Sequence, residues 1–289
     1  TMDTLIEKTD AKSFIIKNLT IIRPVGVKDP NVKLIVDSIS SEIEDVTDRI
    51  KEYYSKLYPP EDTPLKHREK IQRAISLLSP TNPLRVKFLR LALARRHIFA
   101  SPPKVYMRFL SRPMFKRIVK KSVGVDLEDI IPKESLKVRT ISDICKEWIA
   151  LKNNIIIVTS FVRTALYIKK TLEKNLNANI LLMTGRTYNK KRIIESFKEK
   201  APSILILTPV AERDLDFPEA SLVIIHDIIS TVKSMYQRIK RARRSMVMVL
   251  YYADTYEEKK VNILLSRMIK RYPWSIRILW SKRNNLRSR

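Results

Sequence analysis

The sequence predicts an α/β chain in which a parallel-sheet domain is joined to an all-helical domain. Its 289 residues are enough for two domains that each bury a core of their own. Residues 150–252 alternate short apolar runs with helical patterns, which is typical of a parallel sheet whose strands are joined by helices. Residues 30–131 show helical patterns alone. The two textures occupy separate parts of the chain, so we expect two domains of different class.

The N-terminal part begins with a strand-like segment at 12–22, KSFIIKNLTII, and continues into one long helix. Apolar residues between 32 and 57 recur at alternating spacings of four and three, which places them on one helical face. The stripe consists of Val32, Val36, Ile39, Ile43, Val46, Ile50, Tyr53 and Leu57. Pro59 and Pro60 end this helix. We expect the stripe to face a core, and a dimeric coiled coil is the alternative.

Four shorter helices are expected next, each with a proline in its first turn, where the missing N–H is tolerated. They lie near 64–79, 83–99, 102–111 and 113–122. We therefore divide this half of the chain into a strand-like segment at 1–29 and a basic helical domain at 30–135.

The α/β part is expected to contain five strands, of which the first and third are continuous apolar runs typical of strands covered on both faces. The strands lie at 155–161, 179–185, 203–209, 222–227 and 245–252, with helices near 162–175, 188–200, 230–244 and 255–272. Right-handed crossovers would give one open sheet. We assign this domain to 136–280 and a basic tail to 281–289. Trp274 and Trp280 are expected to anchor the terminal segment, and stacking on unpaired bases is the alternative.

The charge of the chain predicts a polyanionic partner. Lys and Arg number 57 against 30 acids, a formal net charge of +27. Residues 70–125 contain no Asp or Glu, although a solvated helix face normally mixes the two signs. We therefore expect a DNA-binding face here, with a solvated face or a scaffold for an acidic protein as alternatives. The predicted contacts are Arg85, Lys87, Arg90, Arg95, Arg96, Lys104, Arg108, Arg112, Lys116, Arg117, Lys120 and Lys121.

The scarcity of glycine excludes two familiar nucleotide-binding loops. Only Gly26, Gly124 and Gly185 occur, and no two of them have the spacing of GxxxxGK[ST] or GxGxxG. The single cysteine, Cys145, and three scattered histidines give no metal-ligand spacing, so we expect no metal site. No apolar run reaches about 18 residues, so we expect no membrane partner and a cytoplasmic, nucleoid-associated protein. Usage rich in Lys and Arg and poor in Gln indicates a thermophile.

Several segments of the α/β part resemble the ordered motifs of superfamily 2 helicases. IIIVTSFVRTALYIKKTL resembles motif IV, LLMTG with ILILTPVAERDLDFPEASLVIIHD resembles the path into motif V, and QRIKRARR resembles motif VI. The resemblance implies a RecA-like sheet domain, the helicase C-terminal lobe. The branch it resembles most is the archaeal Hef and FANCM type, which carries a helical insertion where residues 30–131 lie. The first, ATP-binding lobe of that family has no counterpart in this sequence.

The resemblance also implies roles for individual residues. Arg241 and Arg244 match the motif VI arginines, which stabilise charge on the transferred phosphoryl group, and Gln237 and Asp216 match residues at the nucleotide interface. Positions that contact the nucleic-acid backbone are matched by Thr159, Gly185 and Thr208. ATP and Mg²⁺ would be needed only if a first lobe were supplied by another chain.

Three positions depart from the family pattern. Asp214 replaces the motif V glycine, and Lys240 and Arg243 replace the motif VI glycines. Glycine at such places lets backbone approach phosphate closely, and a carboxylate at 214 would disfavour nucleotide phosphates.

The sequence therefore favours an accessory protein without ATPase activity of its own. We expect it to bind branched or forked DNA in repair or fork processing and to recruit or stimulate an enzyme. Because the Hef family joins its helicase to a nuclease, resemblance suggests an XPF-type nuclease as that partner. The alternative is the second lobe of a split ATP-dependent DNA helicase that supplies Arg241 and Arg244 in trans.

Overall fold

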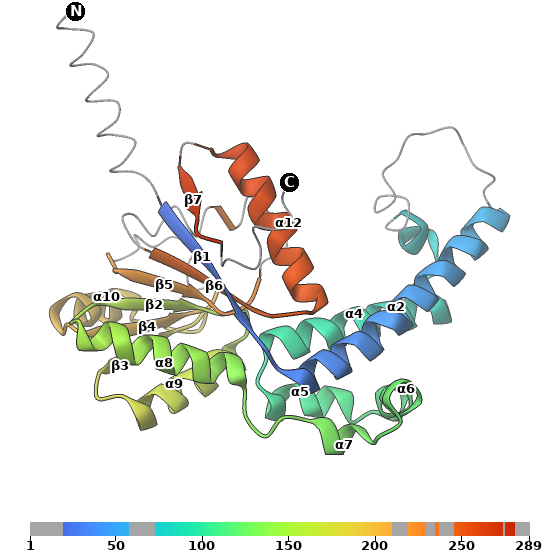
Figure 1. Cartoon of the computed structure of the whole chain (residues 1–289), viewed down its shortest axis with the longest axis horizontal. Coiled ribbons are helices and arrows are strands. Elements are labelled where there is room, and N and C mark those ends of the chain that lie inside the picture. Colours follow the sequence, from blue (N-terminus) through green and yellow to red (C-terminus); the bar gives the residue numbers. More distant parts are fainter. Residues whose placement is uncertain are drawn as a thin grey trace, which may run out of the picture. The chain divides into compact units, whose positions relative to one another are not determined.

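The computed structural model describes residues 20–57, 73–209, 219–228, 235–236, 246–273 and 275–280. The chain divides into two compact units (Figure 1). One combines residues up to Asp29 with 100–102 and the segment from Glu134 onward, and the other combines Pro30–Phe99 with Pro103–Lys133.

The first unit is built on a sheet of seven parallel strands in its described part, in the order β3-β4-β2-β5-β6-β1-β7. The strands are β1 (Thr20–Val27), β2 (Ile155–Val158), β3 (Asn179–Met183), β4 (Ser203–Leu207), β5 (Leu222–Ile225), β6 (Met246–Tyr252) and β7 (Ile276–Ile278). Every residue of β2, β4 and β5 is buried, as the continuous apolar runs predicted for β2 and β4. The parallel α/β sheet expected from the sequence is thus confirmed.

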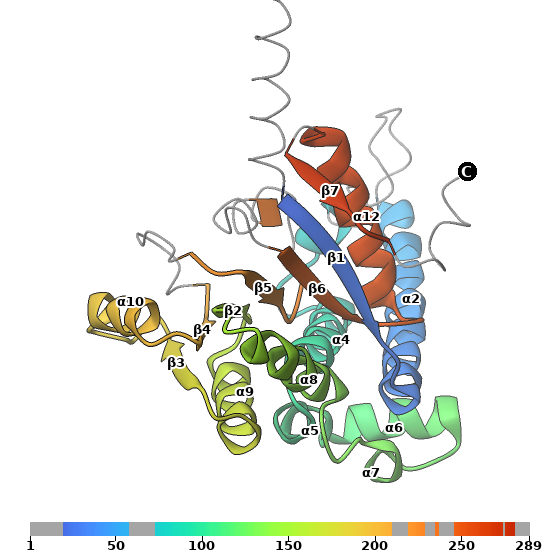
Figure 2. The same cartoon turned by 60° about the vertical axis from the view of Figure 1, so that its left-hand side comes forward.

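Helices cover both faces of this sheet (Figure 2). They are α8 (Leu136–Ala150), α9 (Val162–Asn175), α10 (Lys190–Glu199) and α12 (Tyr256–Arg271). The connection from β2 through α9 runs toward β3, and that from β3 through α10 runs back to β4, so right-handed crossovers place α9 and α10 on opposite faces. Phe197 of α10 joins Val261 and Leu265 of α12 in one core cluster, whereas α8 packs beside α9.

The first strand differs from its prediction. The sequence pattern placed a strand at 12–22, but β1 spans Thr20–Val27, and residues 12–19 lie outside the described part. Pro24 and Gly26 disfavour a strand by local propensity. Pairing with β6 along Ile21–Val27 overrides that preference, and such pairing of distant segments leaves no local signal. Neither β7 nor α8 was expected from the sequence.

The second unit is all-helical in its described part. Its helices are α2 (Pro30–Leu57), α4 (Pro83–Ala100), α5 (Pro103–Leu110), α6 (Pro113–Val123) and the single turn α7 (Leu127–Ile130). Each of the first four begins at a proline, which was expected for α4, α5 and α6. The predicted helix at 64–79 lies largely outside the described residues. Gly124 closes α6 in the left-handed conformation (φ 80°), with its N–H donating to the Lys120 carbonyl.

The stripe along α2 faces the core of this unit. Val32, Val36, Ile39, Ile43, Val46 and Ile50 are buried, whereas Tyr53 is exposed. The expectation of a core-facing helix is confirmed over these six positions, and the buried stripe is not available to a coiled-coil partner.

Candidate nucleic-acid interface

The strand order creates a switch point at the carboxyl edge of the sheet, between β2 and β5. The chain leaves β2 toward β3, and it leaves β5 in the opposite direction toward β6. In open parallel sheets, ligands bind in the crevice that such divergence leaves outside the carboxyl ends. Thr159 and Ser160 follow β2, and His226 and Asp227 follow β5, so these four residues form the floor of the candidate site.

Asp227 organises this floor. Its Oδ1 accepts hydrogen bonds from the Thr159 hydroxyl at 3.0 Å and from the Ser160 N–H at 2.8 Å, and it lies 3.3 Å from His226 Nδ1. Burial alone raises the pKa of Asp227, but hydrogen bonds from His226 and Ser160 outweigh it and hold that pKa below its usual range. Burial lowers the pKa of His226, so both groups favour a neutral imidazole beside an ionised carboxylate.

Thr159 and Thr208, two of the predicted nucleic-acid contacts, are both buried. Because the Thr159 hydroxyl donates to Asp227, it has an internal partner, and its contact with nucleic acid stays a prediction. Thr208 follows β4, and its hydroxyl has no hydrogen-bond partner in the described part of the chain. A buried hydroxyl without a partner is uncommon in proteins. Thr208 therefore has a polar atom at the carboxyl edge that no other described residue satisfies.

Gly185, the third predicted contact, lies in a compact loop after β3. The Thr184 N–H donates to the Thr187 hydroxyl at 3.0 Å, the Thr187 N–H donates to the Thr184 carbonyl at 3.1 Å, and the Arg186 N–H donates to the Thr184 hydroxyl at 3.3 Å. These bonds fix the loop locally. Gly185 and Arg186 are exposed, and the Tyr188 side chain is fully exposed.

The start of α10 continues this loop and adds positive charge. Lys190, Lys191 and Arg192 occupy its first turn, and the N-cap residue, Asn189, makes no capping hydrogen bond with its side chain. Cations are unfavourable at a helix N-terminus, where backbone N–H groups already carry partial positive charge. Such an arrangement is stabilised when an anion binds, and phosphate is a typical ligand.

The sequence interpretation missed the loop residues Arg186, Tyr188, Lys190, Lys191 and Arg192. The signal was present, because RTYNKKR carries four cations around an aromatic residue and no acid occurs from 184 to 194. This charge run is short compared with that of residues 70–125, so charge pattern alone did not distinguish it.

The predicted cationic face of the helical unit is partly neutralised. Lys87 pairs with Glu42, Lys116 with Glu128, and Lys120 lies 3.1 Å from Asp126 Oδ1. These acids lie outside residues 70–125 in the sequence. In the folded chain they contact cations of that block and neutralise part of its charge. The hydrogen bond from Lys116 lowers the pKa of Glu128.

Other members of this face are used internally, and some remain open. Arg85 donates to the Leu78 carbonyl, Arg95 donates to the Ser40 hydroxyl at 3.2 Å, and the Arg112 guanidinium lies 5.0 Å from the centre of the Phe109 ring. Arg96 is exposed. Five further cations are exposed and form no ion pair with the residues described here. They are Arg90, Lys104, Arg108, Arg117 and Lys121.

A buried ion pair, Lys137 and Glu257, lies next to the residues that follow β5 at the carboxyl edge. Lys137 Nζ of α8 lies 2.7 Å from both carboxylate oxygens of Glu257 and 3.4 Å from the His226 carbonyl. The Tyr252 N–H donates to Glu257 Oε2 at 2.8 Å, and Lys137 Nζ lies 4.5 Å from the centre of the Tyr252 ring. The pair thus connects α8, β5, β6 and α12. Burial raises the pKa of Glu257, and the ammonium of Lys137 opposes that shift.

The predicted nucleotide-side residues lie outside the described part of the chain. These are Asp214, Asp216, Gln237, Lys240, Arg241, Arg243 and Arg244. Within the described ranges, no group of three metal-ligating side chains occurs, and no helix is long and apolar enough to cross a membrane.

Residues 136–246 match the family described as the helicase conserved C-terminal domain. This part of the chain is therefore similar to helicase C-terminal domains, as its motifs predicted. The human protein named "Probable ATP-dependent RNA helicase DDX47" is 36% identical over 85 residues, which are 29% of this chain and 18% of the human protein. The chain spans less than a quarter of the length of the curated relatives it matches.

Solved structures share the fold at low sequence identity. The Pyrococcus furiosus Hef helicase domain has a TM-score of 0.56 at 17% identity, over 85% of this chain and 57% of that one. The Sulfolobus solfataricus SWI2/SNF2 ATPase core, solved with double-stranded DNA, has a TM-score of 0.53 at 18% identity, over 88% of this chain and 45% of that one. These similarities extend the fold match beyond residues 136–246.

Proposed function

We propose that this chain is a nucleic-acid-binding accessory protein. It binds nucleic acid through a helicase C-terminal lobe and does not hydrolyse ATP by itself. The observation that carries the proposal is the loop from Thr184 into α10. It presents four cations, a helix start without a side-chain cap and a fully exposed tyrosine at the carboxyl edge of that lobe. Phosphates match the cations and the backbone N–H groups, and an unpaired base matches the tyrosine ring.

The helical unit supports the same proposal independently. Arg117 and Lys121 are four residues apart on α6 and exposed, so they share one face of that helix. Adjacent cations repel each other, and the negative charge of bound phosphates relieves this repulsion. Binding also releases counterions from the nucleic acid. The exposed cations Arg117 and Lys121 suit the α6 face to a charged backbone.

Forked or branched DNA is the substrate that we propose. A fork offers an unpaired strand for Tyr188 and duplex phosphates for α6. A bound nuclease of the XPF type remains our proposal for the enzyme that the chain recruits or stimulates. The relatives named as RNA helicases make single-stranded RNA the necessary comparison.

Tyr188 gives the decisive test. Stacking of one base on an aromatic ring contributes about 1–3 kcal/mol, so Tyr188→Ala should weaken binding of a fluorescent DNA fork by about 5- to 150-fold. Tyr188→Phe keeps the ring and should bind within about twofold of the unaltered chain. Tyr53→Ala removes an exposed tyrosine of α2 and serves as a further control with unchanged affinity.

Fluorescence anisotropy at several salt concentrations provides the measurement. The fork should bind more tightly than linear duplex and than single-stranded RNA of equal length, with affinity falling steeply as salt rises. Equal affinity of Tyr188→Ala and the unaltered chain for the fork would remove the proposed interface. Tighter binding of single-stranded RNA than of the fork would show that RNA, and not DNA, is the substrate.

A further inference from the structure

Beyond Ile22, no strand of the described chain pairs with the outer edge of β1. Backbone groups of alternate residues in a strand face opposite neighbours. On the β6 side, the Val27 carbonyl accepts from the Ala253 N–H at 2.9 Å. On the β7 side, the Thr20 N–H donates to the Ser275 carbonyl at 3.0 Å, and the Ile22 carbonyl accepts from the Leu279 N–H at 2.8 Å. Even-numbered residues of β1 therefore present their backbone groups away from β6.

The neighbouring strand ends too early to use all of these groups. β7 pairs with Thr20–Ile22 and ends at Ile278. The Pro24 carbonyl and the N–H and carbonyl of Gly26 therefore have no strand opposite them among the residues described. Pro24 is buried, whereas Gly26 is exposed. Pro24 fits this position because its missing N–H would also have pointed to the open side.

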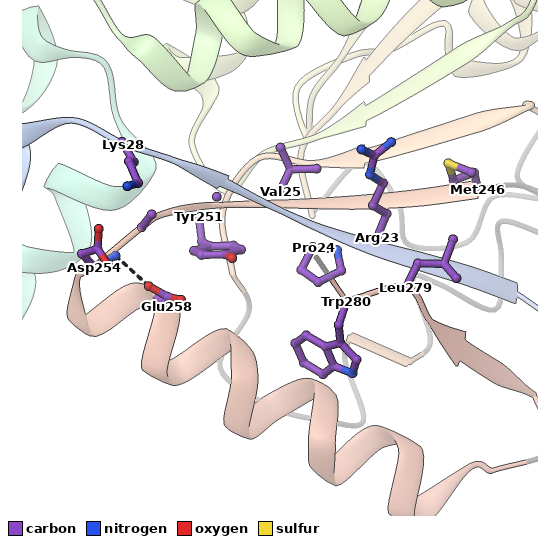
Figure 3. Close-up of a pocket in the computed structure, with 12 residues that line it drawn as sticks. Arg23, Pro24, Val25, Lys28, Met246, Tyr251, Asp254, Glu258, Leu279 and Trp280 are labelled. Atoms are coloured by element: carbon purple, nitrogen blue, oxygen red, sulfur yellow. Dashed lines mark hydrogen bonds between the residues drawn. The ribbon is translucent and has the colours of Figure 1, made fainter. Parts of the chain in front are cut away.

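A pocket of about 580 Å³ adjoins this open edge on the face that α12 covers. Figure 3 shows the Tyr251 ring, the Pro24 ring and the Trp280 indole on the same side of β1, with Arg23 and Val25 directed to the other side. Pockets of this volume accept a large apolar or aromatic side chain. A Cβ on Gly26 would lie 3.1 Å from the Tyr251 ring, so a larger residue here would have to displace that ring slightly.

The charges around the edge favour an acidic occupant. Arg23, Lys28 and Arg277 are exposed and form no ion pair with other described residues. Two acids, Asp254 and Glu258, also line the pocket wall, and Glu258 accepts the Asp254 N–H at 2.6 Å. Exposed cations also prevent edge-to-edge association of like strands, and a second copy of a chain with net charge +27 would be repelled. An acidic segment is attracted by the same cations.

We propose that Pro24–Lys28 and the adjoining pocket form a docking site for an extended, acidic segment of a partner protein. The segment pairs with the N–H and carbonyl of Gly26, and it places one aromatic or long aliphatic side chain in the pocket that Tyr251 and Trp280 line. This site is separate in sequence from the Thr184 loop, and the proposal does not depend on nucleic-acid binding.

The scarcity of glycine provides a selective probe of this site. Labelling the full chain with ¹⁵N-glycine gives backbone amide signals from Gly26, Gly124 and Gly185 alone. The probe ligand is a blocked peptide, Glu-Asp-Ile-Phe-Val-Glu-Asp. It should shift the Gly26 signal and slow exchange of that amide by about tenfold or more, because a new hydrogen bond protects it. Gly124 and Gly185 should not move, whereas forked DNA should shift Gly185 and leave Gly26 in place.

Matched controls separate strand addition from attraction by charge alone. The same peptide with alternate backbone nitrogens methylated keeps its charge but cannot pair, and it should leave Gly26 unshifted. Exchanging its Phe for Ala should weaken binding about tenfold or more, as should Arg23→Glu with Lys28→Glu, whereas the exposed Arg163→Glu on α9 should have no effect. Equal shifts at all three glycines, or equal binding of the methylated peptide, would overturn the proposal.

Discussion

Lys137 and Glu257 show how single residues maintain the carboxyl edge of the sheet. Both are buried, and each would be an uncompensated charge without the other. Removing one partner of such a pair typically costs about 3–5 kcal/mol, whereas replacing both with groups of similar shape costs much less. We therefore expect Lys137→Met to lower the free energy of unfolding by about that amount.

A double-mutant cycle measured by urea denaturation tests this expectation. Lys137→Met combined with Glu257→Gln should be more stable than Lys137→Met alone, because the amide carries no charge and can still accept the Tyr252 N–H. The surface pair Lys169 and Glu173 on α9 is the matched control, and breaking it should change stability by less than about 1 kcal/mol. Additive effects at Lys137 and Glu257 would contradict the coupling.

His226 makes the stability of the first unit sensitive to pH. Its pKa in the folded state is lowered by burial and by the charge of Lys137, with Asp227 acting in the opposite direction. Below a pH of about 6.5, the unfolded chain binds a proton that the folded imidazole does not bind. The free energy of unfolding should therefore fall as pH decreases from 7.5 to 5, by up to about 1.4 kcal/mol per pH unit.

The comparison with His226→Asn isolates this contribution. That variant should lose less stability over the same pH interval, although His97, whose pKa is also lowered by burial, leaves a residual slope. Urea midpoints at several pH values provide the measurement. Parallel slopes in the variant and the unaltered chain would assign the pH dependence to other groups.

Helix α6 carries two rows of cations that differ in their partners. Lys116 and Lys120 are neutralised by Glu128 and Asp126, whereas Arg117 and Lys121 are open. Arg117→Ala with Lys121→Ala should weaken fork binding and reduce the slope of log affinity against log salt by about 2, because each phosphate contact contributes about 0.9 to that slope.

Neutralising the acids gives a control with the opposite sign. Asp126→Asn with Glu128→Gln releases Lys116 and Lys120, so affinity for the fork should rise and the salt slope should steepen. Anisotropy titrations of both double variants provide the comparison. A loss of affinity in the acid-neutralised variant would show that α6 does not contact phosphate.

The elements also show what sequence reasoning could predict. β2, β4 and β5 were predictable because burial on both faces requires continuous apolar runs. β1 was placed too early because its pairing partners lie more than 200 residues away in the chain. Trp280 was expected to anchor the terminal segment, and it packs against the core cluster. The motif pattern identified Thr159 and Thr208. The hydrogen bond from Thr159 to Asp227 could not be predicted, because it depends on the pairing of β2 with β5.

For the whole chain, glycine scarcity and cationic surfaces lead to one expectation about ATP. Phosphate loops need glycine at fixed spacings, and these 289 residues contain no such pair. If Arg241 and Arg244 act as the motif VI arginines that they match, they can accelerate transfer only of a phosphoryl group that is already held. We therefore expect this chain with Mg²⁺, ATP and forked DNA to release no phosphate above the rate of a blank.

Two further reactions distinguish the accessory role from a split helicase. If the chain serves as the second lobe of a two-chain enzyme, adding a separately expressed helicase first lobe should produce DNA-dependent turnover, and Arg241→Ala should reduce it by roughly 10³- to 10⁵-fold. If it serves as an accessory protein, the mixture should remain inactive and Arg241→Ala should bind the fork normally. Turnover by the chain alone that is lost in Arg241→Ala would overturn the accessory role, because a phosphate-binding site would then exist without the glycine loops.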